Sequence, residues 1–224
     1  MPENHQITLK NLKLVKHAPA PWKLKGEGII LIYKFSRKWV EQHGILPEHL
    51  KGKFKGGLGY VMLVNYHTSP VGPYKELLFI PGKFTSYRKQ AITKIYVNTE
   101  VSTQNGHVNW GIPKETLPIS WENQDGKEVI QVKDGEKTVF SCEIKAGGIS
   151  FPLSTSLLPI ELHQHWDGVD FFTKPSGSGW GKRATIKNLQ IDSAFFPNIA
   201  TQKPLFAVKI EPFRIQFPEA TYAI

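Results

Sequence analysis

One lysine of this 224-residue chain stands where an amine could be held for chemistry: Lys114, in the run Trp-Gly-Ile-Pro-Lys-Glu. A lysine amine attacks a carbonyl group only when neutral, and with a pKa near 10.4 a free lysine is only about 0.04% neutral at pH 7. Burial disfavours the ammonium form and lowers a lysine pKa, as a neighbouring cation also does. The neighbours Trp110, Ile112 and Leu117 are apolar, and Pro113 stiffens the backbone just before the lysine. Lys114 is therefore a candidate nucleophile, against the ordinary alternative of a solvated surface lysine.

A second candidate, Glu76, lies in the segment SPVGPYKELLFIPG, where glycines and prolines bracket a short apolar run. If YKELLFI forms a strand, Tyr74 and Glu76 share one face and Lys75 lies on the other. A carboxylate beside a tyrosine on an inward face can transfer protons. The alternative is an exposed glutamate at a strand edge. By the same alternation, Lys114 and Glu115 point to opposite faces and are not expected to meet.

Three other patterns carry weaker signals. His163 and His165 share one face of a predicted strand, but no third ligand is evident nearby, so we predict no metal site. The run PSGSGWGK, residues 175–182, resembles a phosphate-binding loop but lacks the P-loop spacing and a following helix, so we interpret it as a mobile loop. Cys142 lies on the apolar side of an alternating strand and is interpreted as a core residue. No motif indicates a cofactor.

Strand patterns dominate the elements that must position these side chains. EGIILIYKF and LGYVMLVNY are β-branched and aromatic runs of strand length. Residues 119–144 predict a meander, with hairpin turns at the Asp-Gly pairs 125–126 and 134–135. Near the end, FAVKI and FRIQF alternate with period 2 around Pro212, where a bulge or a break is expected.

Helix signals are few. Ser36 is predicted to cap a short helix through RKWVEQH that ends at Gly44, and a further turn is expected at residues 47–50. No repeat or linker divides the chain. The sequence therefore predicts a mainly β (α+β) fold, a closed antiparallel β-barrel with a few short helices, as one domain over residues 1–224, because closure removes exposed strand edges.

Composition limits the classes of function. A net charge of +9 can indicate a nucleic-acid partner, but the lysines are scattered and no nucleic-acid-binding motif accompanies them, so none is predicted. No window approaches the roughly 18 consecutive apolar residues of a membrane helix, and the run MPENHQITLKNLKLVKH lacks the pattern of a signal peptide. A lone cysteine excludes an internal disulfide and fits a reducing compartment. We expect a cytoplasmic protein with no membrane partner.

Taken together and in this order, the two candidate segments resemble the acetoacetate decarboxylase superfamily. PAPWKLKGEGIILIYKF resembles the first strand region of that family, and GPYKE resembles its glutamate-bearing segment. NGHVNWGIPKE is similar to its Gly-Arg-Glu…Pro-Lys motif, with Gly106, Pro113 and Lys114 at matching spacing. The resemblance covers most of residues 19–121. It implies a cone-like barrel whose interior lysine forms a Schiff base with a keto acid, in a protein that is often a homo-oligomer.

The chain departs from the family at several polar positions. Glu115 replaces a second lysine, and His107 and Val108 replace the arginine and glutamate of the motif. Glu27 stands where we align an arginine that binds the substrate carboxylate, and Val61 where we align a further glutamate. Loss of that arginine removes the group that would orient a carboxylate. Desolvation alone can replace the contribution of the second lysine to the pKa of the amine.

These residues give the following functional prediction. The predicted catalytic residues are Lys114 and Glu76, and the predicted substrate-binding residues are Tyr74, Trp110, Ile112, Glu27, His107 and Val61. The predicted activity is that of a lyase that uses a lysine imine on a small keto acid or carbonyl compound, by decarboxylation, aldol or retro-aldol reaction, or dehydration. The alternative is a non-catalytic barrel that binds a small apolar or carbonyl ligand, with Lys114 merely structural.

Overall fold

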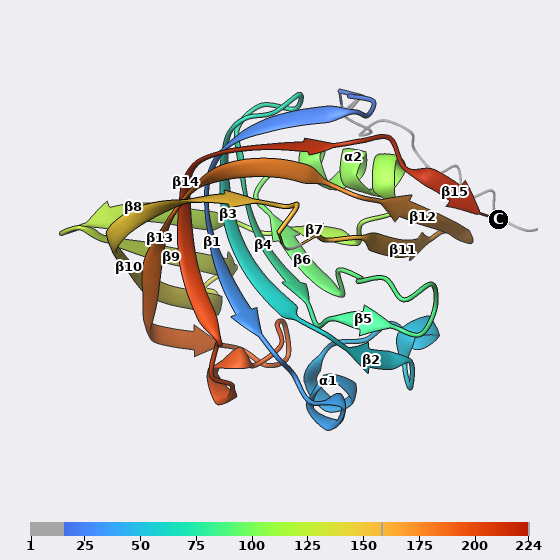
Figure 1. Cartoon of the computed structure of the whole chain (residues 1–224), viewed down its shortest axis with the longest axis horizontal. Coiled ribbons are helices and arrows are strands. Elements are labelled where there is room, and N and C mark those ends of the chain that lie inside the picture. The colour runs from blue at the N-terminus through green and yellow to red at the C-terminus, as the bar shows by residue number, and fades with distance from the viewer. Residues whose placement is uncertain (1–15, 158, 224) are drawn as a thin grey trace, which may run out of the picture.

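The computed structural model describes residues 16–157 and 159–223, and most of them lie in β-strands. The largest sheet has ten strands in the order β7-β6-β4-β3-β1-β14-β13-β10-β9-β8. All its pairings are antiparallel except the parallel pair β6–β7. Smaller sheets of order β11-β12-β15 and β2-β5 lie beside it (Figure 1). The prediction of a mainly β chain is confirmed.

The bounds of the elements are as follows. The strands are β1 (Trp22–Tyr33), β2 (Phe54–Gly56), β3 (Gly59–Thr68), β4 (Tyr74–Ile80), β5 (Lys83–Phe84), β6 (Lys94–Val97), β7 (Lys114–Thr116), β8 (Ile119–Gln124), β9 (Lys127–Asp134), β10 (Lys137–Ser154), β11 (Leu162–Trp166), β12 (Val169–Thr173), β13 (Ser176–Ile191), β14 (Phe206–Phe217) and β15 (Thr221–Ala223). The helices are α1 (Arg37–His43) and α2 (Glu100–Trp110), with short 3-10 turns at η1 (Glu48–Leu50) and η2 (Ile199–Thr201).

The large sheet curls around a hydrophobic core. Side chains from its middle, such as Leu31 and Leu63, belong to the same buried cluster as Val132 and Phe140 from its far end. Strands so far apart in the order can share a core only because the sheet bends toward that face. The predicted core position of Cys142 is confirmed, since this side chain belongs to the same cluster.

The curl forms a half-barrel, and the predicted closed cone is not confirmed. The edge strands β7 and β8 show no ladder between them among the described residues. They are instead consecutive in the chain and joined by only two residues. The amide of Leu117 donates to Val97 on the β6 side, whereas the carbonyl of Pro118 accepts from Lys133 on the β9 side. The two edge strands are therefore connected by a short stretch of chain and not by hydrogen bonds between their backbones.

The outer face of β1, β3, β4 and β6 carries a second hydrophobic cluster. Alternation along β1 sends Ile29 and Leu31 into the first core and Ile32 into the second. The end of α2 and the small sheet add Trp110, Leu162 and Phe171 to this second cluster, so they cover this face (Figure 1). The candidate chemistry lies in this second layer.

Several local predictions are confirmed, one is wrong and one helix was missed. Helix α1 begins after Ser36, whose hydroxyl accepts from the amide of Trp39, and the register of β14 shifts at Pro212 as expected. Residues 175–182 are not a loop, because β13 starts at Ser176 and pairs with β10 and β14. Helix α2 was not predicted at all. The expectation of no signal peptide falls on N-terminal residues that lie largely outside the described ones.

No helix among the described residues is long and apolar enough to cross a membrane.

Candidate active site

The run Trp-Gly-Ile-Pro-Lys ends a helix and starts a strand. Gly111 has a left-handed conformation (φ 61°), which ends α2, and its amide donates to the carbonyl of His107. Pro113 then bars a return to helix. The amide of Lys114 donates to the carbonyl of Ile112 at 2.8 Å, which closes a tight turn around the proline. Lys114 becomes the first residue of β7, at a backbone position fixed on both sides.

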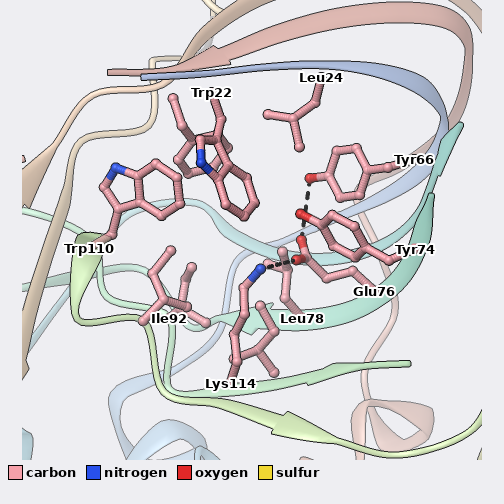
Figure 2. A pocket seen from close by; sticks show the side chains of 12 residues that line it. Trp22, Leu24, Tyr66, Tyr74, Glu76, Leu78, Ile92, Trp110 and Lys114 are labelled. Carbon is pink, nitrogen blue, oxygen red and sulfur yellow. Dashed lines mark hydrogen bonds and ion pairs between the residues drawn. The ribbon is translucent and has the colours of Figure 1, made fainter. Parts of the chain in front are cut away.

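Lys114 and Glu76 form a buried ion pair. Ile95 of β6 pairs with Lys114, and Val97 of β6 pairs with Glu76 of β4, so both charged side chains lie on one face of the sheet. The Nζ of Lys114 lies 3.1 Å from Oε2 of Glu76, and these side chains are only 4% and 5% exposed. Figure 2 shows the amine pointing across the sheet at the carboxylate. The surface-lysine and edge-glutamate alternatives are therefore excluded.

Helix α2 fixes the remaining contacts of the lysine. The amine donates to Oγ of Ser102, which is fully buried, at 3.1 Å, and it lies 5.0 Å from the centre of the Tyr74 ring. Gly106 makes room for the lysine stem, because a Cβ at this position would lie 2.6 Å from its Cδ. The ring of His107 lies 2.9 Å, through Nε2, from the carbonyl oxygen of Lys114. The helix thus holds both the backbone and the amine of Lys114.

Two tyrosines complete the surroundings of Glu76. The hydroxyl of Tyr66 donates to Oε1 of Glu76 at 3.4 Å, and the rings of Tyr66 and Tyr74 are 4.6 Å apart. Burial, and after it the negative charge of Glu76, raises the pKa of both phenols well above its usual value. Both tyrosines therefore remain protonated at neutral pH, so Tyr66 serves the carboxylate as a hydrogen-bond donor.

A small recess of about 30 Å³ opens beside the amine. Trp22 and Trp110 wall it with hydrocarbon, because their indole N–H groups donate elsewhere, to the carbonyls of Ala18 and Pro218. Figure 2 shows these two rings next to each other at one side of the recess. A volume of this size is about the share of one liquid water molecule, so it has room for little more than a carbonyl group.

The structure brings some predicted substrate-binding residues to this recess and not others. Tyr74, Trp110 and Ile112 line it. Val61 does not, because it belongs to the core on the inner face of the sheet. His107 binds the backbone of Lys114 and stacks on Trp166 at 4.1 Å, outside the recess lining.

Glu27, also predicted to bind substrate, does not line the recess, because its side chain faces the inner side of the sheet. It forms an ion pair with Lys209 at 3.1 Å, which also contacts Glu128 and Glu211. Burial raises the pKa of Glu27, but hydrogen bonds from Lys209 and Asn65 outweigh that effect and hold the pKa below its usual value. A negative charge of Glu27 is therefore balanced locally and does not line the recess beside Lys114.

The paired histidines share one carboxylate. Asp170 Oδ1 lies 3.0 Å from Nε2 of His163 and 2.8 Å from Nδ1 of His165. Among residues 16–157 and 159–223, no group of three or more histidine, cysteine, aspartate or glutamate side chains is arranged to hold a metal ion.

Sequence reasoning missed three residues that shape the site: Tyr66, Ser102 and Trp22. Tyr66 and Trp22 line the recess from strands distant in sequence from Lys114, so spacing alone gave no signal for them, whereas Ser102 contacts the amine from α2, the helix that precedes β7. For Ser102 one signal was available. The Gly-Ile-Pro run is a helix-stop pattern and could have indicated a helix before it.

The fold and this site define a class of protein: a curled β half-barrel with a lysine–glutamate pair buried in an apolar recess. The chain belongs to the acetoacetate decarboxylase (ADC) family, whose sequence model matches residues 11–158. The glutamate and lysine segments both lie inside the matched range. No curated protein matches the sequence.

Solved structures share this fold. A structure of acetoacetate decarboxylase aligns with a TM-score of 0.70 at 13% identity, over 92% of this chain and 91% of the other. The acetoacetate decarboxylase from Legionella pneumophila subsp. pneumophila str. Philadelphia 1 gives 0.67 at 14% identity, over 92% and 88%. The enduracididine biosynthesis enzyme MppR complexed with pyruvate gives 0.63 at 13% identity, over 94% and 92%. At such identities these similarities establish the fold alone.

Proposed function

We propose that this protein is a lyase of the acetoacetate decarboxylase family that forms a Schiff base between Lys114 and a carbonyl substrate. The observation that carries the proposal is the buried Lys114–Glu76 pair, with 3.1 Å between amine and carboxylate. Buried ionisable groups coupled in this way are concentrated at functional sites. The carboxylate is the base to which the ammonium can pass a proton before it attacks.

The proton balance of imine formation can be followed through these two residues. Glu76 takes one proton from the ammonium, and the neutral amine adds its electron pair to the carbonyl carbon. A proton moves from nitrogen to oxygen to give a carbinolamine. Protonated Glu76 then returns its proton to the hydroxyl, which leaves as water, and the nitrogen lone pair forms the iminium double bond. Ammonium and carbonyl thus become iminium and water, with no net proton uptake.

The iminium acts as the electron sink for the next step. A carbon–carbon bond one atom removed from the iminium carbon breaks, its electron pair moves toward nitrogen, and an enamine remains. Decarboxylation releases CO₂ in this step, and a retro-aldol reaction releases a second carbonyl compound. Protonation of the enamine carbon and addition of water then free the product and the amine. Glu76 and the hydroxyl of Tyr66 are the groups placed to supply and stabilise the proton in transfer.

Reductive trapping tests the proposal. The protein is incubated with acetoacetate, pyruvate or 2-butanone and sodium cyanoborohydride, and intact and peptide masses are measured. We expect one adduct, on Lys114, that is absent in Lys114→Ala and much slower to form in Glu76→Gln. Lys94→Ala is the matched control, because Lys94 is also largely buried but pairs with the exposed Glu115. Folded protein that gives no adduct with any of the three would contradict the proposal and favour a non-catalytic binding protein.

A further inference from the structure

A large cavity lies beside the recess, along the outer face of the main sheet. It has a volume of about 250 Å³ and is bounded by β1, β3, β4, β13 and β14. Its lining is mostly apolar, with Ile30, Ile32, Tyr60, Met62, Val64, Leu78, Ile80, Ile160, Leu162, Val208 and Ile210 among the side chains. Phe206, at the end far from Glu76, is 37% exposed.

Recess and cavity adjoin and share part of their walls. Five residues line both: Tyr66, Glu76, Leu78, Ile92 and Phe217. Strand pairing also gives a single cross-strand row of side chains that runs from the cavity to the nucleophile, in the order Ile30, Met62, Leu78, Ile95 and Lys114. A molecule whose carbonyl group lies beside the amine can therefore extend directly into the cavity.

The chemistry of the cavity selects a hydrocarbon chain. Charged residues in its lining are Glu76, at the end shared with the recess, and Arg214, which is exposed. Between them, Ile30, Met62 and Val208 present only apolar atoms. A hydroxyl or amide in the middle of such a chain would be desolvated without a partner, which opposes binding. A carboxylate at the carbonyl end would face Glu76, and no arginine lines the recess to bind it.

Two estimates of length agree. An apolar cavity of about 150 Å³ binds benzene, with six carbons, so by proportion this volume has room for roughly ten carbons. The cavity runs from β4 across β3 and β1 to β14, which is three strand spacings of about 4.8 Å, or about 14 Å. A hydrocarbon chain advances roughly 1.25 Å per carbon, from C–C bonds of about 1.5 Å, so roughly eleven carbons span that distance, close to the estimate from volume.

We propose that the substrate of Lys114 is an apolar ketone or aldehyde with a chain of up to about ten carbons, which lies in this cavity. Its iminium passes an α proton to Glu76, and the resulting enamine adds to the carbonyl carbon of a second compound, whose oxygen takes that proton. This is the aldol direction of the carbon–carbon lyase reaction. This inference rests on the proposed Schiff-base function and specifies its substrate class. The chain supplies most of the binding energy, and the recess admits the carbonyl group alone.

A series of methyl ketones from acetone to 2-tridecanone, at fixed cosolvent concentration, tests the chain site. The ketone concentration that gives half-maximal trapping on Lys114 should fall about fourfold per added methylene, the value expected for burial of one such group. The fall should level off near ten carbons, where the cavity is full. Equal trapping of acetone and 2-decanone would overturn the proposed chain site and leave the Schiff-base function standing.

Variants locate the chain in the cavity. Met62→Trp and Ile30→Phe should weaken the trapping of 2-decanone at least tenfold with little change for acetone. Val108→Trp is the matched control, because Val108 is 61% exposed on α2 and does not line the cavity. Unchanged 2-decanone trapping in both cavity variants, if they are folded by circular dichroism, would overturn the proposal.

A ligand without a carbonyl separates the two proposals. The alcohol 2-decanol cannot form an imine, so its binding, measured by calorimetry, reports the cavity alone. We expect wild type and Val108→Trp to bind it about equally and Met62→Trp to bind it at least tenfold more weakly. Binding of 2-decanol without trapping of any ketone would refute the Schiff-base function. Absence of 2-decanol binding to wild type would refute the chain site.

Discussion

The buried Lys114–Glu76 pair predicts a large coupling energy between two side chains. We consider Lys114→Met, Glu76→Met and the double variant. At 3.1 Å and an effective dielectric constant of about 20, the attraction between the charges is about 5 kcal/mol. Removal of one partner leaves an unpaired buried charge and should cost about 3–5 kcal/mol of unfolding free energy. The double variant leaves no such charge, so it should be more stable than either single variant.

Urea unfolding at pH 7, followed by tryptophan fluorescence, measures the four free energies of the cycle. The pair Lys94–Glu115 is the control. Its atoms are closer, at 2.5 Å, but the Glu115 side chain is 56% exposed, so we expect a coupling of only about 0.2–1 kcal/mol. If the unfolding free energies lost in Lys114→Met and Glu76→Met sum to the loss in the double variant within about 0.5 kcal/mol, the two groups do not interact in solution. A coupling no larger than that of the control would likewise refute the argument that burial makes this pair strong.

Three further predictions concern single residues. Gly106→Ala should fold but lower reductive trapping at the nucleophile by about tenfold or more, because the added Cβ would displace the lysine stem; Gly147→Ala, where a Cβ meets nothing within 4 Å, should trap like wild type. Burial raises the pKa of Cys142 to about 12, so this thiol should react with Ellman's reagent at pH 8 only in urea, and rapid reaction of the folded protein would contradict its burial. Because the pKa of Glu27 is lowered, its ion pair with Lys209 stabilises the fold above about pH 4.5 and loses this effect as pH falls through the lowered pKa. In wild type the urea midpoint should therefore fall below pH 4.5, and in Lys209→Met this fall should be flatter. An unchanged slope in the variant would count against the pair.

Local patterns predicted the parts of the fold that local chemistry determines. Alternation placed Tyr74 and Glu76 on one face of β4, and both side chains are buried there. It also separated Lys114, which faces the recess, from Glu115, which pairs outward with Lys94. Strand type and side-chain direction follow from residues next to one another, so one sequence is sufficient for them.

The failures come from elements whose burial depends on distant partners. Helix α2 buries small and polar residues such as Ser102, Asn105 and Asn109, so it has no apolar stripe of helical period. Asn105 and Asn109 are instead satisfied by the backbone near Ala18, about 90 residues away in the chain. That partnership exists only after the fold has formed.

The misplacement of Val61 has a related cause. Strand β3 is buried on both faces, so its apolar run is nearly continuous and does not show which side meets the recess. The pairing of Val64 with Glu76 decides this, and it places Tyr60, Met62 and Tyr66 on the side of Glu76 and Val61 on the other. An alignment by spacing alone cannot supply that register, because a shift of one residue exchanges the two faces.

The sizes of the two spaces connect the proposed chemistry to the proposed substrate. A recess of about 30 Å³ has too little room for a whole keto acid beside the amine, so most atoms of a reacting molecule must lie in the adjoining 250 Å³. That volume is apolar, and the arginine expected of a carboxylate-binding site is absent from the recess lining. Binding energy from a remote chain can hold the carbonyl group against Lys114 and compensate for the desolvation of the pair. The Schiff-base pair would then be preserved, while the length of an apolar chain, and not the charge of a carboxylate, would determine which substrate binds. For this reason the trapping series by chain length is more informative than activity on any single keto acid.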